Sequence, residues 1–292
     1  MTNCTPADPN PEKSTLGVVA ISYNESQDLP GFLENLQDWV DEIVIVDDGS
    51  TDDTAAIARS ASDKVTFVVS PRTEGEYFSH QRNKGIHLAN SDWLLHMDID
   101  ERVTPELAQE ILQAIQDPNK DGYRYRRLNY FLHRPMQSGG WQNWNLVHLA
   151  RRQQFHFEGM FHETCVLDAP AERVGQLQAK MWHLNDKSYQ ARMRKSFTYC
   201  EEQAQRLSQR YARLTWLHLL ALPLFEFFRK LILKGGYRDG TPGVLFAMHS
   251  AGAMFRACAL TWDRQNGISR GSIEAEIQTM WSRSKEVSYV KG

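Results

Sequence analysis

The sequence predicts an α/β fold built on a mostly parallel sheet, and two features of residues 1–120 support this prediction. Short apolar runs rich in β-branched residues alternate with stretches in which apolar residues recur every three to four positions. Strands that alternate with helices form parallel sheets with helices on both faces. The predicted strands are residues 16–22, 42–46, 64–69 and 92–97, and the predicted helices are residues 29–39, 53–60 and 79–89.

Acidic side chains follow three of these four apolar runs. Glu25 comes shortly after the first run, Asp47 and Asp48 end the second, and Asp98 and Asp100 follow the fourth. Ligands of open parallel sheets bind outside the carboxyl ends of the strands, so we expect these carboxylates to converge on one crevice. Like charges in a cleft are unfavourable unless a cation or a ligand neutralises them. The cluster therefore predicts a metal site.

The strongest single indication of a metal is Asp98-Ile99-Asp100, directly after a predicted buried strand. Residues i and i+2 at a strand end point the same way, so both carboxylates can share one divalent ion. Carboxylate oxygens suit Mg²⁺ or Mn²⁺. Acidic pairs with this spacing also occur on solvated loops, and the alignment with Asp47 and Asp48 is what favours the metal interpretation.

Beyond residue 120 the pattern changes. Residues 121–167 carry aromatic and basic residues in short alternating runs, with Gly139 and Gly140 as a turn, which is typical of antiparallel strands that extend a sheet. After Asp186 the pattern becomes helical. Residues 1–15 are polar and proline-rich, which predicts a disordered tail without a secretory signal.

Charge is divided unevenly along the chain. Residues 1–120 carry −14, residues 121–240 carry +9 and residues 241–292 carry +2, which leaves a net charge of −3. This division argues against nucleic acid as a partner and favours an anionic ligand or membrane surface at the middle segment, although a merely solvated basic face would give the same count. The four cysteines form no C-x-x-C pair, which fits a reducing compartment.

The most hydrophobic stretch covers residues 214–233 and contains Pro223, where we expect a kink. Its polar residues fall on one narrow stripe at helical spacing. Two interpretations stay open: a helix packed on its own domain, and a helix lying in a bilayer interface. No run of about 18 uninterrupted apolar residues occurs, so the sequence predicts no membrane-spanning helix. The stripe consists of Thr215, His218, Glu226, Arg229 and Lys230.

The motif VDDGSTDDT at residues 46–54 resembles the second-strand motif of family 2 glycosyltransferases of the GT-A fold. Three further motifs occur in that family's order: ISYNE at 21–25, HQRNKGI at 80–86 and WLLHMDIDE at 93–101. The later part of the chain is similar to the lipopolysaccharide core-biosynthesis branch of the family. That similarity covers GMFHETCVL at 159–167, MWHLNDKSYQ at 181–190 and KGGYRDGTPG at 234–243. In that branch a small residue usually stands at the position of Ile99, whose side chain we expect to point away from the ion.

The resemblance implies a metal-dependent, inverting enzyme. It would move a hexose from a nucleotide sugar, with UDP-glucose favoured, to a lipid-linked envelope glycan such as the lipopolysaccharide inner core. Asp100 would hold Mg²⁺ or Mn²⁺, with Asp98 beside it and His183 or His162 as further candidates. The implied nucleotide-binding residues are Tyr23, Asn24, Glu25, Asp47, Asp48, Arg82 and Asp98.

Glu163 matches the position of the carboxylate that would take the proton from the acceptor hydroxyl. Glu158 is a weaker rival for this role, and an ion pair between Glu163 and an arginine such as Arg151 is the structural alternative. Basic residues would bind the phosphates of a glycolipid acceptor or an anionic membrane surface. They are Arg124, Arg126, Arg127, Arg192, Arg194 and Lys195.

On this resemblance, residues 16–120 would bind the sugar nucleotide, residues 121–190 would form the acceptor and catalytic portion, and residues 191–292 would form a helical region with a membrane-interfacial helix. We expect a cytoplasmic protein, peripheral on the inner face of the cytoplasmic membrane. The alternatives are a nucleotidyltransferase acting on sugar phosphates, which the absence of a glycine-rich phosphate loop disfavours, a glycosyltransferase with a protein or peptide acceptor, and a non-enzymatic acidic scaffold.

Overall fold

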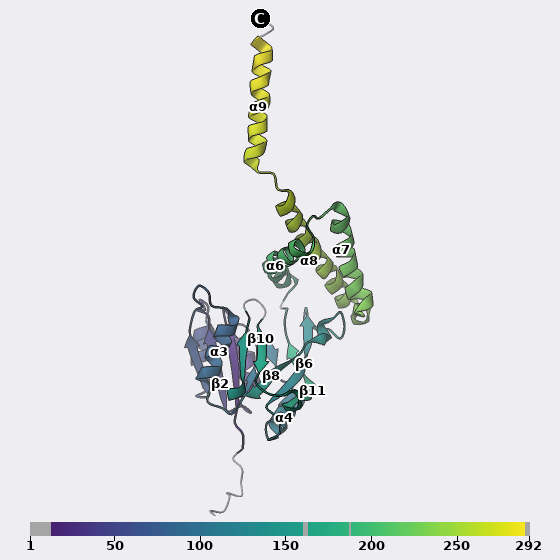
Figure 1. The fold of residues 1–292 in the computed structure, drawn as a ribbon. Helices are drawn as coiled ribbons and strands as arrows, with labels where there is room; N and C mark the ends of the chain where they lie inside the picture. Colours follow the sequence, from purple (N-terminus) through teal and green to yellow (C-terminus); the bar gives the residue numbers. More distant parts are fainter. Residues whose placement is uncertain (1–12, 160–162, 187, 290–292) are drawn as a thin grey trace, which may run out of the picture. The chain divides into compact units, whose positions relative to one another are not determined.

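The computed structural model describes residues 13–159, 163–186 and 188–289. The chain forms two compact units, Met1–Lys187 and Ser188–Gly292, and Figure 1 labels several of their helices and strands. The tail expected at residues 1–15 lies outside the described residues except for its last three positions, which lead into the first strand.

The first unit is built on one large sheet that begins with four parallel strands. In spatial order these are β3 (Val65–Val69), β2 (Glu42–Asp47), β1 (Leu16–Ser22) and β4 (Trp93–His96). The helices between them are α1 (Leu29–Leu36), α2 (Thr54–Arg59) and α3 (Phe78–Leu88). The predicted alternation of strands and helices is confirmed, with boundaries that differ by at most three residues.

The sheet continues through four more strands in the spatial order β8 (Asn145–Arg151), β6 (Gly122–Phe131), β11 (Val174–His183) and β5 (Glu101–Arg102). β8 is antiparallel to both β4 and β6, as predicted, whereas β11 runs parallel to β6. A long excursion separates β6 from β11, so the chain can return in the same direction. The remaining elements are α4 (Pro105–Ala114), β7 (Arg134–Pro135), the hairpin β9 (Phe155–Glu158) and β10 (Thr164–Leu167), and 3₁₀ turns at Trp141–Asn143, Arg152–Gln154 and Ala171–Arg173.

Three of the parallel strands, β2, β1 and β4, are buried on both faces, which explains their continuous apolar runs, whereas the edge strand β3 is only partly buried. On one face Val18 of β1 packs in the main core with Phe32 of α1, and on the other face Val19 packs with Ile86 of α3. A Cβ atom at Gly85 would overlap the Val19 side chain. The close approach of α3 to β1 therefore depends on glycine, and it places the polar side chains of α3 beside the ends of the strands.

The second unit is helical, as predicted. Its elements are α5 (Tyr189–Thr198), α6 (Cys200–Arg210), α7 (Trp216–Phe228), a π-helical turn (Arg229–Leu233), a 3₁₀ turn (Gly236–Asp239), α8 (Thr241–Asn266) and α9 (Arg270–Tyr289). Leu207 of α6 and Leu214 pack with Ala257 and Cys258 of α8 in a small core. Partly buried Leu219 and Leu222 bring α7 against the same core.

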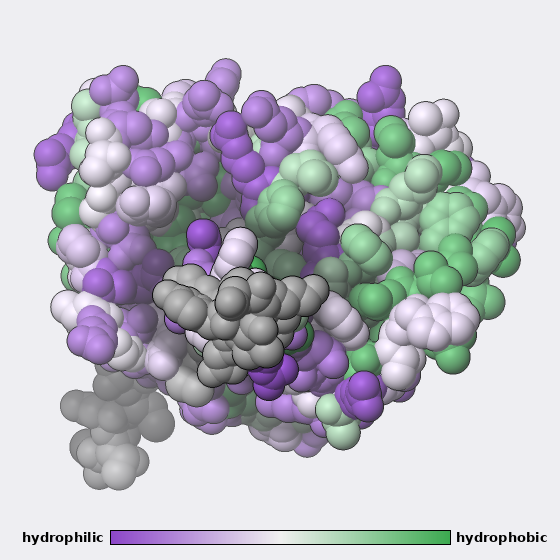
Figure 2. All heavy atoms as spheres, turned by 90° about the horizontal axis from the view of Figure 1, so that it is seen from above, coloured by the Kyte–Doolittle hydropathy of each residue, from purple (hydrophilic) through white to green (hydrophobic). Residues whose placement is uncertain are grey.

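The opposite side of α7 is apolar and exposed to solvent. Figure 2 shows hydrophobic side chains gathered over this helix. Each of six large side chains is more than half exposed: Trp216, Leu217, Leu220, Leu224, Phe225 and Phe228. In addition, α8 has the length and the mean hydropathy, 1.3, of a helix that could cross a membrane, with a third of its apolar window buried. A single helix of this kind also occurs in the cores of soluble proteins, so this finding is weak by itself.

Candidate active site

The acidic loops meet at one edge of the sheet, as the sequence predicts. The parallel register places Ser22 at the end of β1 beside Asp47 at the end of β2, and β4 ends just before Asp98. Two consecutive residues of α3 then reach both loops. Gln81 Nε2 lies 3.3 Å from Asp48 Oδ1, and Arg82 Nη2 lies 2.9 Å from Asp98 Oδ1.

Asp47 organises the loop after β2. Its side chain is buried, with 1% of the residue exposed. Oδ1 accepts hydrogen bonds from the hydroxyls of Ser22 and Ser50 at 2.7 and 2.6 Å, and Oδ2 accepts from the backbone N–H groups of Gly49 and Ser50 at 3.0 and 2.7 Å. Both oxygens of Asp47 therefore stabilise the loop, and a contact of Asp47 with the nucleotide stays a prediction.

Asp48 lies nearer the surface and is paired with Arg72. The Arg72 backbone N–H donates to Asp48 Oδ1 at 2.7 Å and its Nε donates to Oδ2 at 2.8 Å. Burial raises the pKa of Asp48, but these hydrogen bonds and the arginine charge outweigh it, so the pKa lies below its ordinary value. Sequence reasoning missed Arg72, although its position just after β3 was a usable signal.

The loop after β1 is tied to the loop after β2. Asn24 adopts a left-handed backbone conformation, with φ of 56°. Its Oδ1 accepts a hydrogen bond from the backbone N–H of Thr51 at 2.8 Å, and the backbone N–H of Glu25 donates to Thr54 Oγ1 at 2.8 Å. Tyr23, directly before these two hydrogen-bonded residues, is 56% exposed. Nucleotide contacts by these residues stay a prediction; Tyr23 and Asn24 are exposed, and Glu25 is partly buried.

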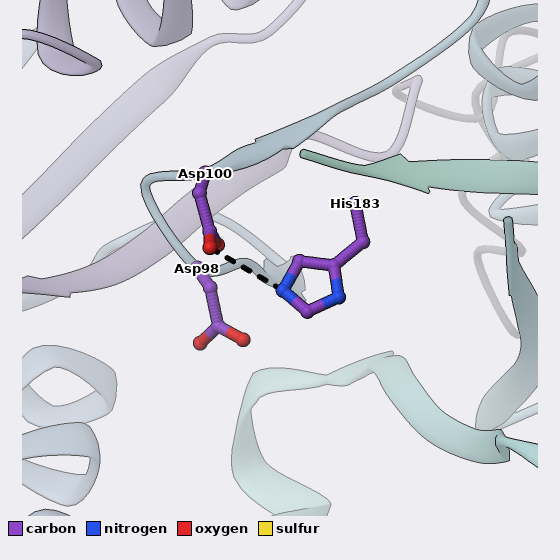
Figure 3. A group of neighbouring side chains, drawn as sticks. All are labelled: Asp98, Asp100 and His183. Carbon is purple, nitrogen blue, oxygen red and sulfur yellow. Dashed lines mark ion pairs between the residues drawn. The ribbon is translucent and has the colours of Figure 1, made fainter. Parts of the chain in front are cut away.

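Asp98, Asp100 and His183 form a group suited to a divalent cation. One ligand atom from each lies within 4.8 Å of the others, and Figure 3 shows Asp100 facing the His183 ring with Asp98 beside them. His183 Nε2 lies 3.4 Å from Asp100 Oδ2, and His183 Nδ1 lies 2.7 Å from Asn129 Oδ1. Because that amide oxygen is an acceptor, Nδ1 carries the proton and Nε2 is the nitrogen that would bind a metal. These groups fit Mg²⁺ or Mn²⁺.

Neighbouring charges set the protonation of this group. Burial raises the pKa of Asp98, but the guanidinium groups of Arg82 and Arg127 outweigh burial and hold that pKa well below its ordinary value. Burial lowers the pKa of His183, but the hydrogen bond and charge of Asp100 more than compensate, so that pKa is raised. Asp98 is therefore ionised at neutral pH, and a proton competes with a cation for His183.

Arg82 joins this group to Glu163. Its guanidinium is largely buried, with 7% of the residue exposed. Nε donates to Glu163 Oε1 at 3.0 Å, Nη2 pairs with Asp98, and Nη1 lies 2.9 Å from Nδ1 of the buried His96. With three protein partners, Arg82 positions the surrounding carboxylates. A direct contact of Arg82 with the base or diphosphate stays a prediction.

Arg151 is not the partner of Glu163. Arg151 Nε lies 3.3 Å from Asp121 Oδ1, and in the pairing of β8 with β4 Arg151 is opposite Trp93, the first residue of β4. Arg151 lies at the amino end of β4 and the site lies at its carboxyl end, so Arg151 is the wrong partner. The alternative of an ion pair between Glu163 and an arginine is itself confirmed, with Arg82 as the arginine. Glu158, the weaker rival for the role of base, is exposed, and its Oε1 lies 2.9 Å from His156 Nε2. His162, the further metal candidate, lies outside the described residues.

Arg127, expected at a phosphate-binding surface, is buried in the site. Its side chain is 10% exposed, forms ion pairs with Asp98 and Glu101, and lies with Cζ 3.9 Å from the centre of the Trp144 ring. The alternation along β6 was a usable signal, because residue 127 shares the inward register of Tyr125. Glu101, also missed from the sequence, is fully buried, and burial raises its pKa to about 7.

Residues 17–167 match the model of the family described as glycosyl transferase family 2. The chain is 24% identical over 275 residues to an uncharacterized glycosyltransferase of Rickettsia felis, which covers 91% of this chain and 95% of that protein. It is 25% identical over 272 residues to the lipopolysaccharide core biosynthesis glycosyltransferase LpsC of Rhizobium meliloti, which covers 90% of this chain and 97% of that protein.

Two solved structures are also similar to the chain. S. aureus TarS 1–349 has a TM-score of 0.45 and 16% identity, with 88% of this chain and 93% of that chain covered. The mannosyltransferase PcManGT from Pyrobaculum calidifontis, in complex with GDP-Man and Mn²⁺, has a TM-score of 0.42 and 16% identity, with 96% and 84% covered. The family match itself spans more than half of the chain and contains every residue of the site described above except His183. The chain therefore belongs to glycosyl transferase family 2, and its first unit has an α/β architecture.

Proposed function

We propose that the protein is a metal-dependent, inverting hexosyltransferase that uses a nucleotide sugar, with UDP-glucose as the favoured donor, and a phosphorylated, lipid-linked glycan such as the lipopolysaccharide inner core as acceptor. The observation that carries this proposal is the group Asp98, Asp100 and His183, joined to Glu163 through Arg82. It combines a cation site with a carboxylate base at the carboxyl edge of the sheet. The full-length similarity to LpsC supports the choice of acceptor.

The donor would lie over the loops after β1, β2 and β4. Asp100 and His183 would hold Mg²⁺ or Mn²⁺, and Asp98 would contact the donor ribose or a water on the ion. When bound, the ion supplies positive charge that stabilises the leaving nucleoside diphosphate. Asp48, held ionised by Arg72, would accept a hydrogen bond from the base, and the exposed Tyr23 ring offers a stacking surface.

Inversion requires a base on the face of the sugar opposite the leaving group. Arg82 engages Glu163 Oε1, which orients the carboxylate and leaves Oε2 to take the proton from the acceptor hydroxyl as its oxygen attacks the sugar carbon. Glu163 is half-buried, so an acceptor can reach it. Arg82 thus sets the position of this base relative to the cation site.

The acceptor and the membrane would be engaged by separate surfaces. On the outer face of β6, Arg124 and Arg126 remain available to phosphate groups, whereas Arg127 does not. In the second unit, the exposed apolar face of α7 favours contact with a bilayer interface over internal packing, and Lys230 and Lys234 follow it directly. We therefore propose a peripheral location on the inner face of the cytoplasmic membrane.

Product analysis with UDP-[¹⁴C]glucose, Mn²⁺ and lipopolysaccharide truncated to its inner core tests the proposal. Transfer of label to the glycolipid with release of UDP is expected, and the stereochemistry of the product reports inversion. Release of pyrophosphate from a sugar phosphate and UTP would instead identify a nucleotidyltransferase. Label on a peptide but not on the glycolipid would identify a protein acceptor.

A thermal-shift panel of sugar nucleotides identifies the donor. UDP-glucose is expected to raise the melting temperature more with Mn²⁺ than without it, because bound ligand stabilises the folded state by mass action. A larger metal-dependent shift with another sugar nucleotide would replace the donor and keep the reaction class.

A further inference from the structure

The proposed reaction gives no role to the buried arginine beside the cation site. We propose that Arg127 is a positioning residue that holds the Asp98 carboxylate in its donor-binding orientation, with Glu101 and Trp144 holding Arg127 in turn. This inference rests on the proposed function, and it goes beyond that function by assigning three residues that carry no direct ligand contact.

Arg127 points into the site from the inward face of β6. Its Nη2 lies 3.1 Å from Asp98 Oδ2, its Nε forms an ion pair with Glu101, and Trp144 covers the guanidinium at 3.9 Å. A buried guanidinium is favourable only where carboxylates neutralise it, and here two do so. Stacking on an indole ring adds a cation–π attraction and confines the guanidinium plane.

Glu101 completes a ring of contacts around the Asp98 loop. The backbone N–H of Asp98 donates to Glu101 Oε2 at 2.9 Å, while Oε1 of the same carboxylate faces Arg127. Arg127 then reaches back to the Asp98 side chain. Backbone and side chain of Asp98 are thus held through one buried carboxylate and one guanidinium, which fixes the loop in a single conformation.

Each oxygen of the Asp98 carboxylate forms an ion pair with a different arginine. Arg82 contacts Oδ1 and Arg127 contacts Oδ2, so rotation of the carboxylate would break one ion pair. Groups that orient ligand-binding side chains in this way typically contribute 10–100-fold to metal affinity. Lysine cannot reproduce the arrangement, because one ammonium group lacks the planar fork that reaches two carboxylates while stacking on a ring.

The test uses three variants of the full chain. Arg127→Gln combined with Glu101→Gln replaces the pair by neutral side chains of similar size and leaves no buried lone charge. Arg127→Lys keeps the charge without the fork. Arg173→Gln combined with Asp121→Asn is the matched control, since it removes another arginine–carboxylate pair of the same unit, at the amino end of β6 and far from the proposed ligands.

Calorimetric titration measures binding of Mn²⁺ alone and of UDP in the presence of Mn²⁺, with circular dichroism and thermal unfolding as fold controls. The Arg127/Glu101 double variant should bind UDP in the presence of Mn²⁺ about 10–100-fold more weakly, Arg127→Lys should be intermediate, and the control pair should match the wild type. In turnover assays the donor KM should rise while the acceptor KM is unchanged, a split that general destabilisation would not produce.

Wild-type affinity in the folded double variant would overturn the inference and leave the proposed function intact. If the double variant unfolds, Arg127→Lys decides: weakened UDP binding in a folded protein supports the positioning role, and wild-type binding overturns it. If the wild type binds neither Mn²⁺ nor UDP, the proposed function itself fails, and this inference fails with it.

Discussion

At the scale of single residues, Asp98 and Asp100 are two positions apart but have different surroundings. The Asp98 carboxylate forms ion pairs with two arginines, whereas Asp100 faces His183, and the two side chains are similarly exposed, at 29% and 25%. This difference in partners supports the proposal that Asp100 and His183 bind the cation and that Asp98 contacts the donor. Ile99 is tolerated between them because its side chain is 3% exposed and belongs to the hydrophobic core.

Replacing Asp100 by Ala should abolish transfer and leave the fold intact, because the side chain is partly exposed and contributes to no apolar core. Calorimetry should show at least a tenfold loss of Mn²⁺ affinity, and the melting temperature should stay close to that of the wild type. EDTA should reproduce the loss of activity in the wild type, and added Mn²⁺ should restore it. Turnover retained by the Asp100→Ala variant would contradict the role given to the cation.

A buried histidine pair makes stability depend on pH. Burial, followed by the charges of Arg127 and Arg82, lowers the pKa of His148 to about 3, and burial lowers the pKa of His96 well below its ordinary value. Below pH 6.5 the unfolded chain therefore binds more protons than the folded chain. The stability contributed by each neutral histidine is fully present above pH 6.5 and is lost as the pH falls toward the folded pKa, by about 1.4 kcal/mol per pH unit.

His148→Phe should reduce this acid sensitivity. The ring packs edge-on against Trp144, Tyr125 and Phe157, and its buried Nδ1 has no hydrogen-bond partner among the described residues. Phenylalanine would lose the hydrogen bond of the imidazole to the His96 backbone, but the His96 carbonyl would keep the hydrogen bond from the Tyr125 hydroxyl. Between pH 7 and pH 5 the variant should lose about 2 kcal/mol less stability than the wild type. Urea unfolding at both pH values measures this difference. Equal losses in the two proteins would show that His148 is not the titrating group.

At the scale of elements, the contact of α3 with β1 positions the site. α3 carries Gln81 and Arg82, which reach the two acidic loops, and the close approach at Gly85 fixes their distance from the sheet. A glycine inside a helix lowers helix propensity, and packing against Val19 explains its presence here.

Gly85→Ala should destabilise the protein by about 1–3 kcal/mol, because the new methyl group would overlap Val19 and push α3 off the sheet. Donor affinity should fall as well, since Arg82 moves with the helix. Gly252→Ala in α8 is the matched control. There the new methyl group would meet Arg256 Nη1 at an ordinary contact distance of 3.6 Å, so urea unfolding should show no loss of stability. Similar effects of the two substitutions would refute the packing explanation.

At the scale of the whole molecule, the acidic N-terminal segment and the basic middle segment differ by 23 charges, from −14 to +9. Within the first unit, Asp98 and Asp100 belong to the proposed cation site, and Glu101 and Glu163 are joined to it through Arg127 and Arg82. The second unit combines basic residues with the exposed apolar face of α7. Such a surface is typical of proteins that bind anionic lipid bilayers.

The full chain should therefore co-sediment with vesicles that contain anionic lipid and bind less to purely zwitterionic vesicles or at high salt. Replacing Trp216 and Leu220 by Ser should reduce binding further, because both side chains are more than half exposed on α7. Leu88→Ser, which removes an exposed apolar side chain from the first unit, is the control. Sedimentation that is indifferent to lipid charge and to both variants would remove the membrane from the proposed function.

The sequence by itself determined the alternation of strands and helices in the first unit and the helical nature of the second. It also identified Asp98, Asp100 and His183, which lie together in the structure. These features were predictable because the period of apolar residues and the polar residues at strand ends are local properties of the chain. The meeting of the acidic loops was also predictable, because parallel strands place their carboxyl ends at one edge of the sheet.

Only the tertiary structure decided which charges become partners. Arg82 and Glu163 are 81 positions apart, and no local pattern links them. Arg127 and Glu101 pair across separate strands, and Asp47 accepts hydrogen bonds from the backbone of its own loop. Folding brings these groups into a low-dielectric interior, where each charge must find a counter-ion or hydrogen-bond partner. The choice of partner depends on which side chains meet in space, and it cannot be predicted from the local sequence of any one segment.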